Sequence, residues 1–349
     1  MSQGELPSNS PCAIFETMKN LTNVTLLTLI LLALPCRARE FWLGADISGT
    51  TLLEHMGKQL YNAAGEPREN TALMKELGLN AIRLRVWVNP RGGWSGADDV
   101  LVMARRARDL NMALMIDFHY SDWWADPGKQ YPPKAWKDLD YTAMCDSLAK
   151  HTVDVLSLLK RDGIDVRWVQ VGNETTDGFL WETGRASTHP DQYAGLTRAG
   201  YDAVKSVYPD AAVIVHVDCG SDAKRYDRIF GILKSNNVPF DIIGMSVYPY
   251  WDAKEGLQDH WTGTIDGVVA NANRLSVLYD CPVMIVETGV EAAHPIEGKE
   301  ILSAIIDAAR NRCTDCLGVF YWAPEAEGQY PLGAFENHRP TVIMDAFKQ

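Results

Sequence analysis

Eight short apolar runs recur along the chain at intervals of about 30 to 50 residues. Each run is almost continuously hydrophobic, which is typical of parallel strands covered on both faces and not of half-exposed antiparallel strands. The predicted strands cover residues 41–48, 81–88, 113–120, 166–174, 211–218, 241–250, 282–289 and 318–324.

Amphipathic segments with helical periodicity separate many of these runs, and some end on a glycine, a common helix stop. The predicted helices include residues 69–78, 97–110, 140–163, 189–209 and 297–311. Strand and helix alternate without a break in composition, which predicts one α/β domain, a single (β/α)8 TIM barrel over residues 39–349. A doubly wound sheet is the alternative, but no glycine-rich nucleotide-binding loop follows any of the runs.

Residues 1–38 read as a leader. Lys19 precedes an apolar stretch from Val24 to Leu34, and small residues follow at Cys36 and Ala38, as in a secretory signal peptide. A membrane-spanning helix is the alternative, but the stretch is shorter than the ~20 residues that a bilayer requires. We expect translation to start at Met18 and the product to be exported, with lipid attachment at Cys36 as a further option.

The composition is consistent with this fold. The net charge limits the expected partners, and the cysteine content limits the expected disulfides and metal sites. The 349 residues are 46% hydrophobic and 22% charged, as in a soluble globular protein, and the net charge is −12. An acidic surface repels phosphates, so nucleic acid and anionic membranes are poor partners, and a neutral polymer fits better.

Five cysteines follow the leader, namely Cys145, Cys219, Cys281, Cys313 and Cys316. An odd number cannot pair completely within one chain. Cys313 and Cys316 form a CxxC that could be a disulfide, a metal half-site or two free thiols. Because no second CxxC accompanies it, a disulfide or free thiols are favoured over metal.

Polar and aromatic side chains gather where the predicted strands end. In a barrel these ends meet at one face, which carries the active site. The residues concerned include Asp46, Arg83, Trp87, His119, Asn173, Glu174, Tyr248, Glu287 and Trp322. They are expected to line one cleft.

Glu174 and Glu287 are the most informative of these residues, because they end strands on opposite sides of the predicted barrel. Two facing carboxyl groups are what glycoside hydrolysis requires, and a separation of about 5 to 5.5 Å indicates retention of configuration. An isolated glutamate after a strand would more simply be a surface residue. Metal binding is a further option, but no HExxH or EF-hand pattern supports it.

Tryptophan supplies a second signal, since aromatic faces pack on the apolar face of a sugar ring. Many tryptophans follow strands, and the segment 121–130 holds Trp123 and Trp124 beside Asp122. Such a segment is better suited to a cleft than to a core. Trp168, inside a predicted strand, is expected to be core.

In order along the chain, "GADIS", "RLRVWVNP", "DFHYSDWWADPGKQ", "QVGNE", "GFLWETG", "GMSVYPYW", "VET" and "FYWAP" resemble glycoside hydrolase family 53, the endo-β-1,4-galactanases of the clan A retaining barrels. The resemblance implies Glu174 as acid/base and Glu287 as nucleophile, supported by Arg83, His119, Asn173 and Tyr248. Asn173 would hold the sugar 2-hydroxyl, and Tyr248 would hydrogen-bond the nucleophile. Implied sugar contacts are Asp46, Trp87, Asp122, Trp123, Trp124, Trp251 and Trp322.

Two departures from the family pattern affect the expected subsites near strands 7 and 8. Ala323 stands where the family often has glutamate, and "ETGVEAAH" replaces a pattern with tyrosine and a second aromatic residue. Some bacterial relatives bind calcium after strand 7, but residues 289–298 lack a run of Asp and Asn ligands. We therefore expect no metal and no cofactor.

The resemblance implies retaining endo-hydrolysis of β-1,4-galactan, the side chain of pectic arabinogalactan, by an exported protein that we expect to be monomeric. Another clan A activity, such as a β-mannanase or cellulase, shares the two glutamates and is the alternative among enzymes. A non-catalytic polysaccharide-binding protein is the alternative outside enzymes, although both carboxylates are present.

Overall fold

The computed structural model of the chain describes residues 1, 4, 40–328 and 330–348. The predicted leader, its start at Met18 and the lipid anchor at Cys36 concern residues outside this description. The chain divides into two units, Met1–Glu40 and Phe41–Gln349, and every helix and strand described below lies in the second.

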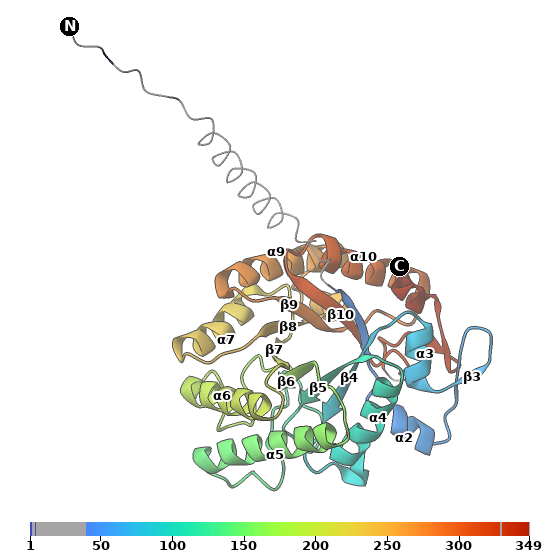
Figure 1. Cartoon of the computed structure of the whole chain (residues 1–349). Helices are drawn as coiled ribbons and strands as arrows, with labels where there is room; N and C mark the ends of the chain where they lie inside the picture. Colours follow the sequence, from blue (N-terminus) through green and yellow to red (C-terminus); the bar gives the residue numbers. More distant parts are fainter. Residues whose placement is uncertain (2–3, 5–39, 329, 349) are drawn as a thin grey trace. The chain divides into compact units, whose positions relative to one another are not determined.

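Eight parallel strands of the described chain close into a barrel in the order β1-β10-β9-β8-β7-β6-β5-β4 (Figure 1). The strands are β1 (Trp42–Asp46), β4 (Ala81–Val86), β5 (Ala113–Phe118), β6 (Trp168–Val171), β7 (Ala212–Val217), β8 (Ile242–Val247), β9 (Val283–Thr288) and β10 (Cys316–Trp322). The predicted (β/α)8 barrel is thereby confirmed. Two short hairpins, β2 (Leu60–Tyr61) with β3 (Pro67–Arg68) and β11 (Phe335–Glu336) with β12 (Arg339–Pro340), stand outside it.

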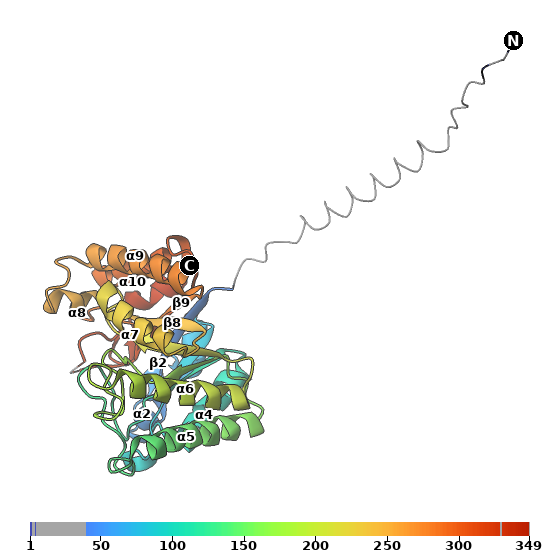
Figure 2. The ribbon, with the colours of Figure 1, turned by 90° about the vertical axis from the view of Figure 1, so that its left-hand side faces the viewer.

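Helices surround the barrel, as the two views at right angles show (Figures 1 and 2). They are α2 (Thr50–His55), α3 (Asn70–Glu76), α4 (Ala97–Asp109), α5 (Tyr141–Arg161), α6 (Pro190–Val207), α7 (Ala223–Ser235), α8 (Pro249–Lys254), α9 (Trp261–Tyr279) and α10 (Pro295–Asn311), with 3-10 turns η1 (Arg91–Gly93) and η2 (Val342–Phe347). Side chains fix several starts: Asp140 accepts a bond from the Ala143 N–H, and Asp222 from the Lys224 N–H.

The barrel interior has an apolar layer below a polar one. The apolar layer consists of Trp42, Ala81, Met115, Trp168, Ile214, Ile242, Met284, Val286, Leu317 and Phe320. Trp168 is only 3% exposed and meets Trp42 edge to face, as expected of a core residue. The Phe320 ring lies over Gly44, where an added Cβ would come within 2.3 Å of it. Dense packing of this layer supports the polar side chains above it.

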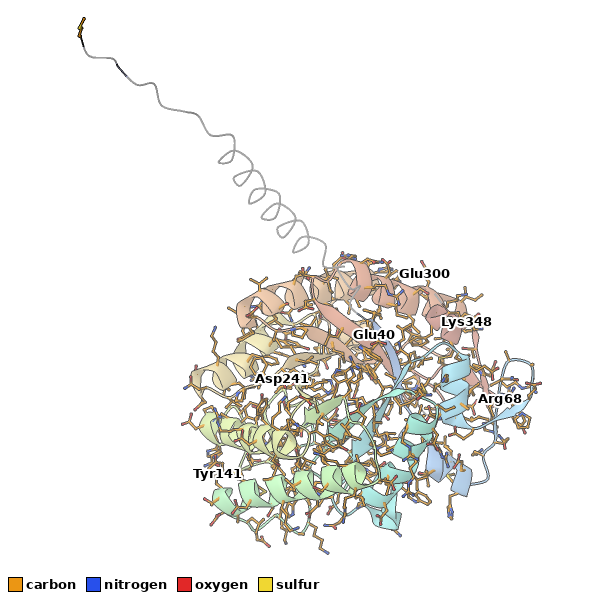
Figure 3. All side chains as sticks on the ribbon, in the orientation of Figure 1. Glu40, Arg68, Tyr141, Asp241, Glu300 and Lys348 are labelled. Carbon is orange, nitrogen blue, oxygen red and sulfur yellow. The ribbon has the colours of Figure 1, made fainter. Side chains whose placement is uncertain are left out.

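Charged side chains such as Arg68 and Glu300 lie toward the periphery of the barrel (Figure 3). None of the described helices has the combination of length and apolar character that crossing a bilayer demands. Cys145, Cys219, Cys281 and Cys313 carry free thiols, so a disulfide between Cys313 and Cys316 is absent from the described structure.

Candidate active site

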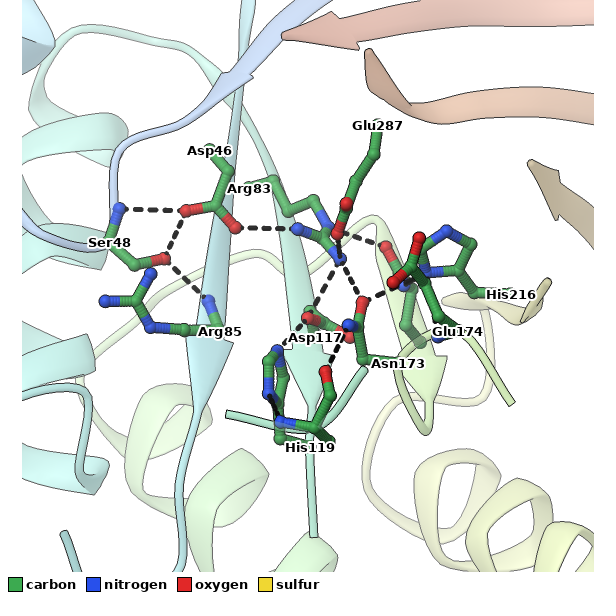
Figure 4. Close-up of polar contacts among 12 residues, drawn as sticks. Asp46, Ser48, Arg83, Arg85, Asp117, His119, Asn173, Glu174, His216 and Glu287 are labelled. Atoms are coloured by element: carbon green, nitrogen blue, oxygen red, sulfur yellow. Dashed lines mark hydrogen bonds and ion pairs between the residues drawn. The ribbon is translucent and has the colours of Figure 1, made fainter. Parts of the chain in front are cut away.

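Arg83 is the centre of the polar layer and has no solvent exposure. Its guanidinium contacts the carboxylates of Asp46 at 2.7 Å, Asp117 at 2.9 Å and Glu287 at 2.8 Å (Figure 4). It also donates to Gln170 Oε1 at 2.7 Å and Asn173 Oδ1 at 2.9 Å. A buried cation needs such partners, because an unpaired charge in the interior is strongly unfavourable.

Glu287 reaches this network through an irregularity in its strand. Met284 and Val286 belong to the interior apolar layer, so strict alternation would turn residue 287 away from the interior. The pairing of β8 with β9 shifts by one residue, from Met245 opposite Ile285 to Ser246 opposite Glu287. This shift brings the Glu287 carboxylate to Arg83, and Tyr248 donates to its second oxygen at 3.1 Å.

Glu174 is positioned by a sharp turn after β6. Gly172 has φ of 86°, and an added Cβ would lie 2.5 Å from Thr175 Cγ2. Glu174 itself has φ of 45°, a left-handed conformation that is uncommon for residues with a side chain. Strand β6 therefore ends at Val171, three residues before the end of the predicted run, and the turn carries Asn173 and Glu174 into the site.

A hydrogen-bonded chain from β7 and β8 holds the Glu174 carboxylate. Gln170 Nε2 lies 3.0 Å from His216 Nδ1, and the Glu174 N–H donates to the same nitrogen at 3.3 Å. With Nδ1 as acceptor, His216 Nε2 donates to Ser246 Oγ at 2.8 Å, and Ser246 Oγ donates to Glu174 Oε1 at 2.6 Å. Burial, reinforced by Arg83, holds the pKa of His216 well below its usual range, which makes the imidazole neutral.

The two glutamates differ in charge environment. Burial raises the pKa of Glu174 well above its ordinary value, and the charges of Glu287 and Asp218 raise it further. Burial also raises the pKa of Glu287, but Arg83 opposes the rise and the value is about 7. Glu287 is therefore the first of the pair to ionise, which leaves a carboxylate beside a protonated carboxylic acid.

The remaining predicted supporting residues join the same network. His119 Nε2 lies 2.9 Å from Asp117 Oδ2, and its Nδ1 accepts from the Ala125 N–H at 3.0 Å. Burial acts to raise the pKa of Asp117, but Arg83 and His119 lower it below its usual value. Asn173 Nδ2 donates to the Ala125 carbonyl at 2.8 Å.

A cleft of about 1010 Å³ lies over the carboxyl ends of the strands and contains both glutamates. Trp124, Trp251, Trp322 and Tyr330 line it, together with His119, Asn173 and Tyr248. Arg85 supports this wall from below, with its guanidinium carbon 4.1 Å from the centre of the Trp124 ring. Trp322 meets Trp124 edge to face at 5.5 Å.

Four predicted sugar contacts do not line this cleft. Asp46 is 1% exposed and uses its oxygens on Arg83 and Ser48, and Trp87 is 3% exposed. Asp122 accepts from the backbone N–H groups of Asn89 and Lys134, each at 2.9 Å, and so ties two loops together. Trp123 is 58% exposed and stacks on Trp87 at 4.9 Å.

Several residues of the site were missing from the sequence-based candidates. Gln170, His216 and Ser246 are single polar residues within apolar strands, and a polar side chain interrupting a buried strand is the signal that could have identified them. Gln130 was also missed; its amide donates to the carbonyls of Asn173 at 2.7 Å and Glu174 at 3.2 Å.

A buried carboxyl group that was not among the sequence-based candidates lies just after β10. Ala323 has no carboxylate to offer, but Glu325, two residues later, is 5% exposed, and its Oε2 lacks a hydrogen-bond partner. Burial, with the charge of Asp46, raises the pKa of Glu325 to about 7. Among the described residues, no group of three or more His, Cys, Asp or Glu side chains is arranged to hold a metal ion.

Comparisons with known proteins agree on one family. The model of glycosyl hydrolase family 53 matches residues 42–333. The endo-β-1,4-galactanase of Bacillus subtilis is 31% identical over 82% of this chain and 70% of its own length, and an uncharacterised Niallia circulans protein is 36% identical over 72% and 68%. A solved family 53 catalytic domain from Ignisphaera aggregans superposes with a TM-score of 0.79 at 28% identity, covering 90% of this chain and 97% of that one. The chain therefore belongs to glycosyl hydrolase family 53.

Proposed function

We propose that this protein hydrolyses β-1,4-galactosidic bonds within galactan, the side chain of type I arabinogalactan. The observation that carries this proposal is the pair of unequal carboxyl groups, Glu174 and Glu287, in one cleft of a family 53 barrel. The names of curated relatives support the substrate, since the protein from Aspergillus niger is an arabinogalactan endo-β-1,4-galactanase.

Glu287 acts as the nucleophile. Arg83 and Tyr248 each donate to its carboxylate, which stabilises the ionised form and orients one oxygen toward the anomeric carbon. Attack at C1 forms a covalent galactosyl ester and breaks the bond to the leaving oxygen. Arg83 makes no direct contact with substrate in this scheme; it holds the charge and direction of Glu287.

Glu174 acts as the general acid and then as the general base. Its raised pKa keeps a proton available for the departing oxygen, so the leaving sugar departs as a neutral alcohol. Glu174 then removes a proton from water, which attacks C1; the ester bond to Glu287 breaks and the galactooligosaccharide is released with retained configuration. The His216 and Ser246 chain fixes the carboxyl group through both steps.

The remaining roles follow from position. Asn173 uses one amide hydrogen on Ala125 and has a second for the 2-hydroxyl of the sugar. Trp124, Trp251 and Trp322 contact sugar rings in the cleft. We assign Asp46, Trp87 and His119 to support of the site, Asp122 to loop anchoring, and Trp123 to an outer position along the polymer.

Export of the protein is part of this proposal. An extended polysaccharide lies outside the cell, and the apolar segment from Val24 to Leu34 after Lys19 has the composition of a signal peptide. Amino-terminal sequencing of the protein recovered from culture medium would test the cleavage position.

The decisive experiment compares linear β-1,4-galactan with mannan and cellulose as substrates for the wild-type protein. We expect cleavage of galactan alone, and an enzyme that cleaves mannan while leaving galactan intact would overturn the proposal. A binding protein without activity is tested by Glu287→Gln, which should retain galactan binding and lose hydrolysis.

The two glutamates are distinguished by their leaving-group dependence. Glu174→Gln should reduce kcat/KM on galactan by about 10²- to 10⁴-fold, the usual value of general acid catalysis. On a nitrophenyl galactoside the loss should be much smaller, because nitrophenolate departs without a proton. Glu287→Gln should abolish both activities, and equal losses for both variants on both substrates would contradict these roles.

A further inference from the structure

Charged side chains line part of the cleft near Glu174. Its wall there comes from the segment after β7, the start of α7 and the end of α8. We call Asp218, Asp222, Arg225 and Glu255 the charged wall. Together with Lys224 and Arg228, which also line the cleft, these residues include three acidic and three basic groups.

Arg225 organises this wall. Its guanidinium pairs with the Asp218 carboxylate, with Asp222 Oδ2 at 3.1 Å and with Glu255 Oε2 at 3.0 Å. Asp218 is 5% exposed and also accepts a hydrogen bond from the Thr176 hydroxyl. Arg228 donates to the Thr176 carbonyl at 2.6 Å, so the wall is tied to the turn that carries Glu174.

The chemistry of the wall suits a neutral, hydroxylated ligand. An arginine has five N–H donors, and the three ion pairs of Arg225 occupy three of them. Two donors remain, and the adjoining carboxylates supply acceptors. The wall therefore offers hydrogen bonds of both kinds, as the hydroxyl groups of a sugar require.

The order of the two glutamates along the cleft sets which part of the substrate meets this wall. Thr176, two residues after Glu174, contacts Asp218 through its hydroxyl and Arg228 through its carbonyl, whereas Glu287 contacts Arg83 in the barrel interior. Glu174 therefore lies toward the charged wall. A general acid contacts the oxygen of the leaving sugar, whereas the nucleophile contacts C1 of the sugar that is retained.

We propose that the charged wall binds the first leaving-group sugar through hydrogen bonds to its hydroxyl groups, with Arg225 as the contacting donor and Asp218 as its positioning residue. This inference rests on the proposed hydrolysis of galactan.

The test compares two substrates that differ only in the leaving group, a linear β-1,4-galactooligosaccharide and a nitrophenyl β-1,4-galactobioside. Arg225→Gln should lower kcat/KM for the oligosaccharide by about 10- to 100-fold, the value of one or two hydrogen bonds to a charged group. For the nitrophenyl substrate, which places no sugar against the wall, the change should stay within about twofold.

Arg274→Gln is the matched control. Arg274, on α9, pairs at 2.6 Å with Asp227, which lies on α7 as Arg225 does. Both side chains of this pair are exposed, and neither lines the cleft. This variant should leave both substrates unaffected. Equal losses for Arg225→Gln on both substrates, or no loss on the oligosaccharide, would overturn the subsite.

Removal of Arg225 leaves Asp218 buried without its cation, which could prevent folding. Glu255→Gln avoids this difficulty because the Glu255 side chain is half-exposed. This variant should also lower kcat/KM for the oligosaccharide and not for the nitrophenyl substrate, by a smaller factor than Arg225→Gln. An unselective effect of Glu255→Gln would count against the proposal. A wild-type enzyme inert on galactan would overturn the proposed function itself, whereas unselective variants of an active enzyme would overturn the subsite alone.

Asp218 has a separate readout. The charged groups acting on Glu174 are Glu287 from β9, Asp218 after β7 and Asp126 after β5, and those around Asp218 are Arg225 and Glu255. Asp218→Asn removes a negative charge near Glu174, so the alkaline limb of kcat/KM on the galactooligosaccharide, whose leaving sugar requires the Glu174 proton, should move to lower pH. A purely structural role would leave that limb unmoved, and such a result would overturn the positioning role.

Discussion

Glu174 and Glu287 are identical side chains that the fold places beside different neighbours. Glu287 has a guanidinium and a phenol as donors, whereas Glu174 has one hydroxyl donor and the negative charges of Glu287 and Asp218 nearby. The proposed mechanism requires Glu287 ionised and Glu174 protonated. In the pH profile of kcat/KM on galactan, the acidic limb should therefore follow the ionisation of Glu287. The alkaline limb should follow the loss of the proton from Glu174.

Ser246→Ala tests the donor to Glu174. The Ser246 hydroxyl stabilises the ionised form of Glu174 and so lowers its pKa. Without it the pKa rises, and the alkaline limb of kcat/KM should move to higher pH, opposite to the shift expected for Asp218→Asn. Measurement of both profiles on the galactooligosaccharide provides the check, and shifts in the same direction would contradict this arrangement.

Glu325 should affect stability through its proton. Burial raises its folded-state pKa from 4.5 to about 7, so the folded state holds a proton that the unfolded state releases at lower pH. The contribution of Glu325 to the free energy of unfolding is fully present below about pH 4.5. It is lost as pH rises through about 7, a change on the order of 3 kcal/mol.

Glu325→Gln removes this dependence, because the amide does not ionise. Urea unfolding at pH 5 and pH 8 should show a variant that gains stability over the wild type at pH 8 and gains little at pH 5. An equal difference at both pH values would indicate that Glu325 keeps the same protonation state throughout.

At the scale of elements, the sequence pattern predicted the barrel well. Continuous apolar strands and amphipathic helices depend on local composition, and each predicted strand overlaps an observed one. Two features depended on details that no pattern shows. The register shift in β9 turns Glu287 inward, and the left-handed turn after β6 sets the direction of Glu174.

The site residues that the sequence analysis did not identify also depend on three-dimensional details that no sequence pattern shows. His216 and Ser246 became recognisable only when closure of the barrel brought β7 beside β6 and β8. Conversely, Asp46 follows a strand as a ligand-binding residue would, yet three-dimensional packing commits it to Arg83. A residue's position along a strand predicts the layer it occupies, but the partners it meets there depend on the neighbouring strands.

Gly172→Ala tests the turn that carries Glu174. Both Gly172 and Gly163, which follows α5, have positive φ, but an added Cβ meets Thr175 at 2.5 Å only at Gly172 and finds open space at Gly163. Each alanine should cost about 1 kcal/mol of stability through backbone strain. Only Gly172→Ala should also lose galactan hydrolysis, as measured by kcat/KM beside urea unfolding. Equal activity in the two variants would argue against a demanding turn.

At the scale of the whole molecule, the net charge of −12 is compatible with a neutral substrate but would slow association with an anionic one. Galactan hydrolysis should therefore change less than about twofold when salt is raised from low to high ionic strength, because screening has no substrate charge to act on. A strong salt dependence of kcat/KM would indicate an acidic polysaccharide as the preferred substrate.

The position proposed for the charged wall, beside Glu174, would give the enzyme a direction along its polymer. A polysaccharide has chemically distinct ends, and in the proposed mechanism the fragment that departs first carries the original reducing end, because the nucleophile retains the sugar whose C1 it attacks. Rapid mixing with a galactooligosaccharide labelled at that end should therefore release label in a burst whenever hydrolysis of the ester limits turnover. The same oligosaccharide labelled at its other end should show no burst, because the fragment with that end stays bound to Glu287 until water hydrolyses the ester.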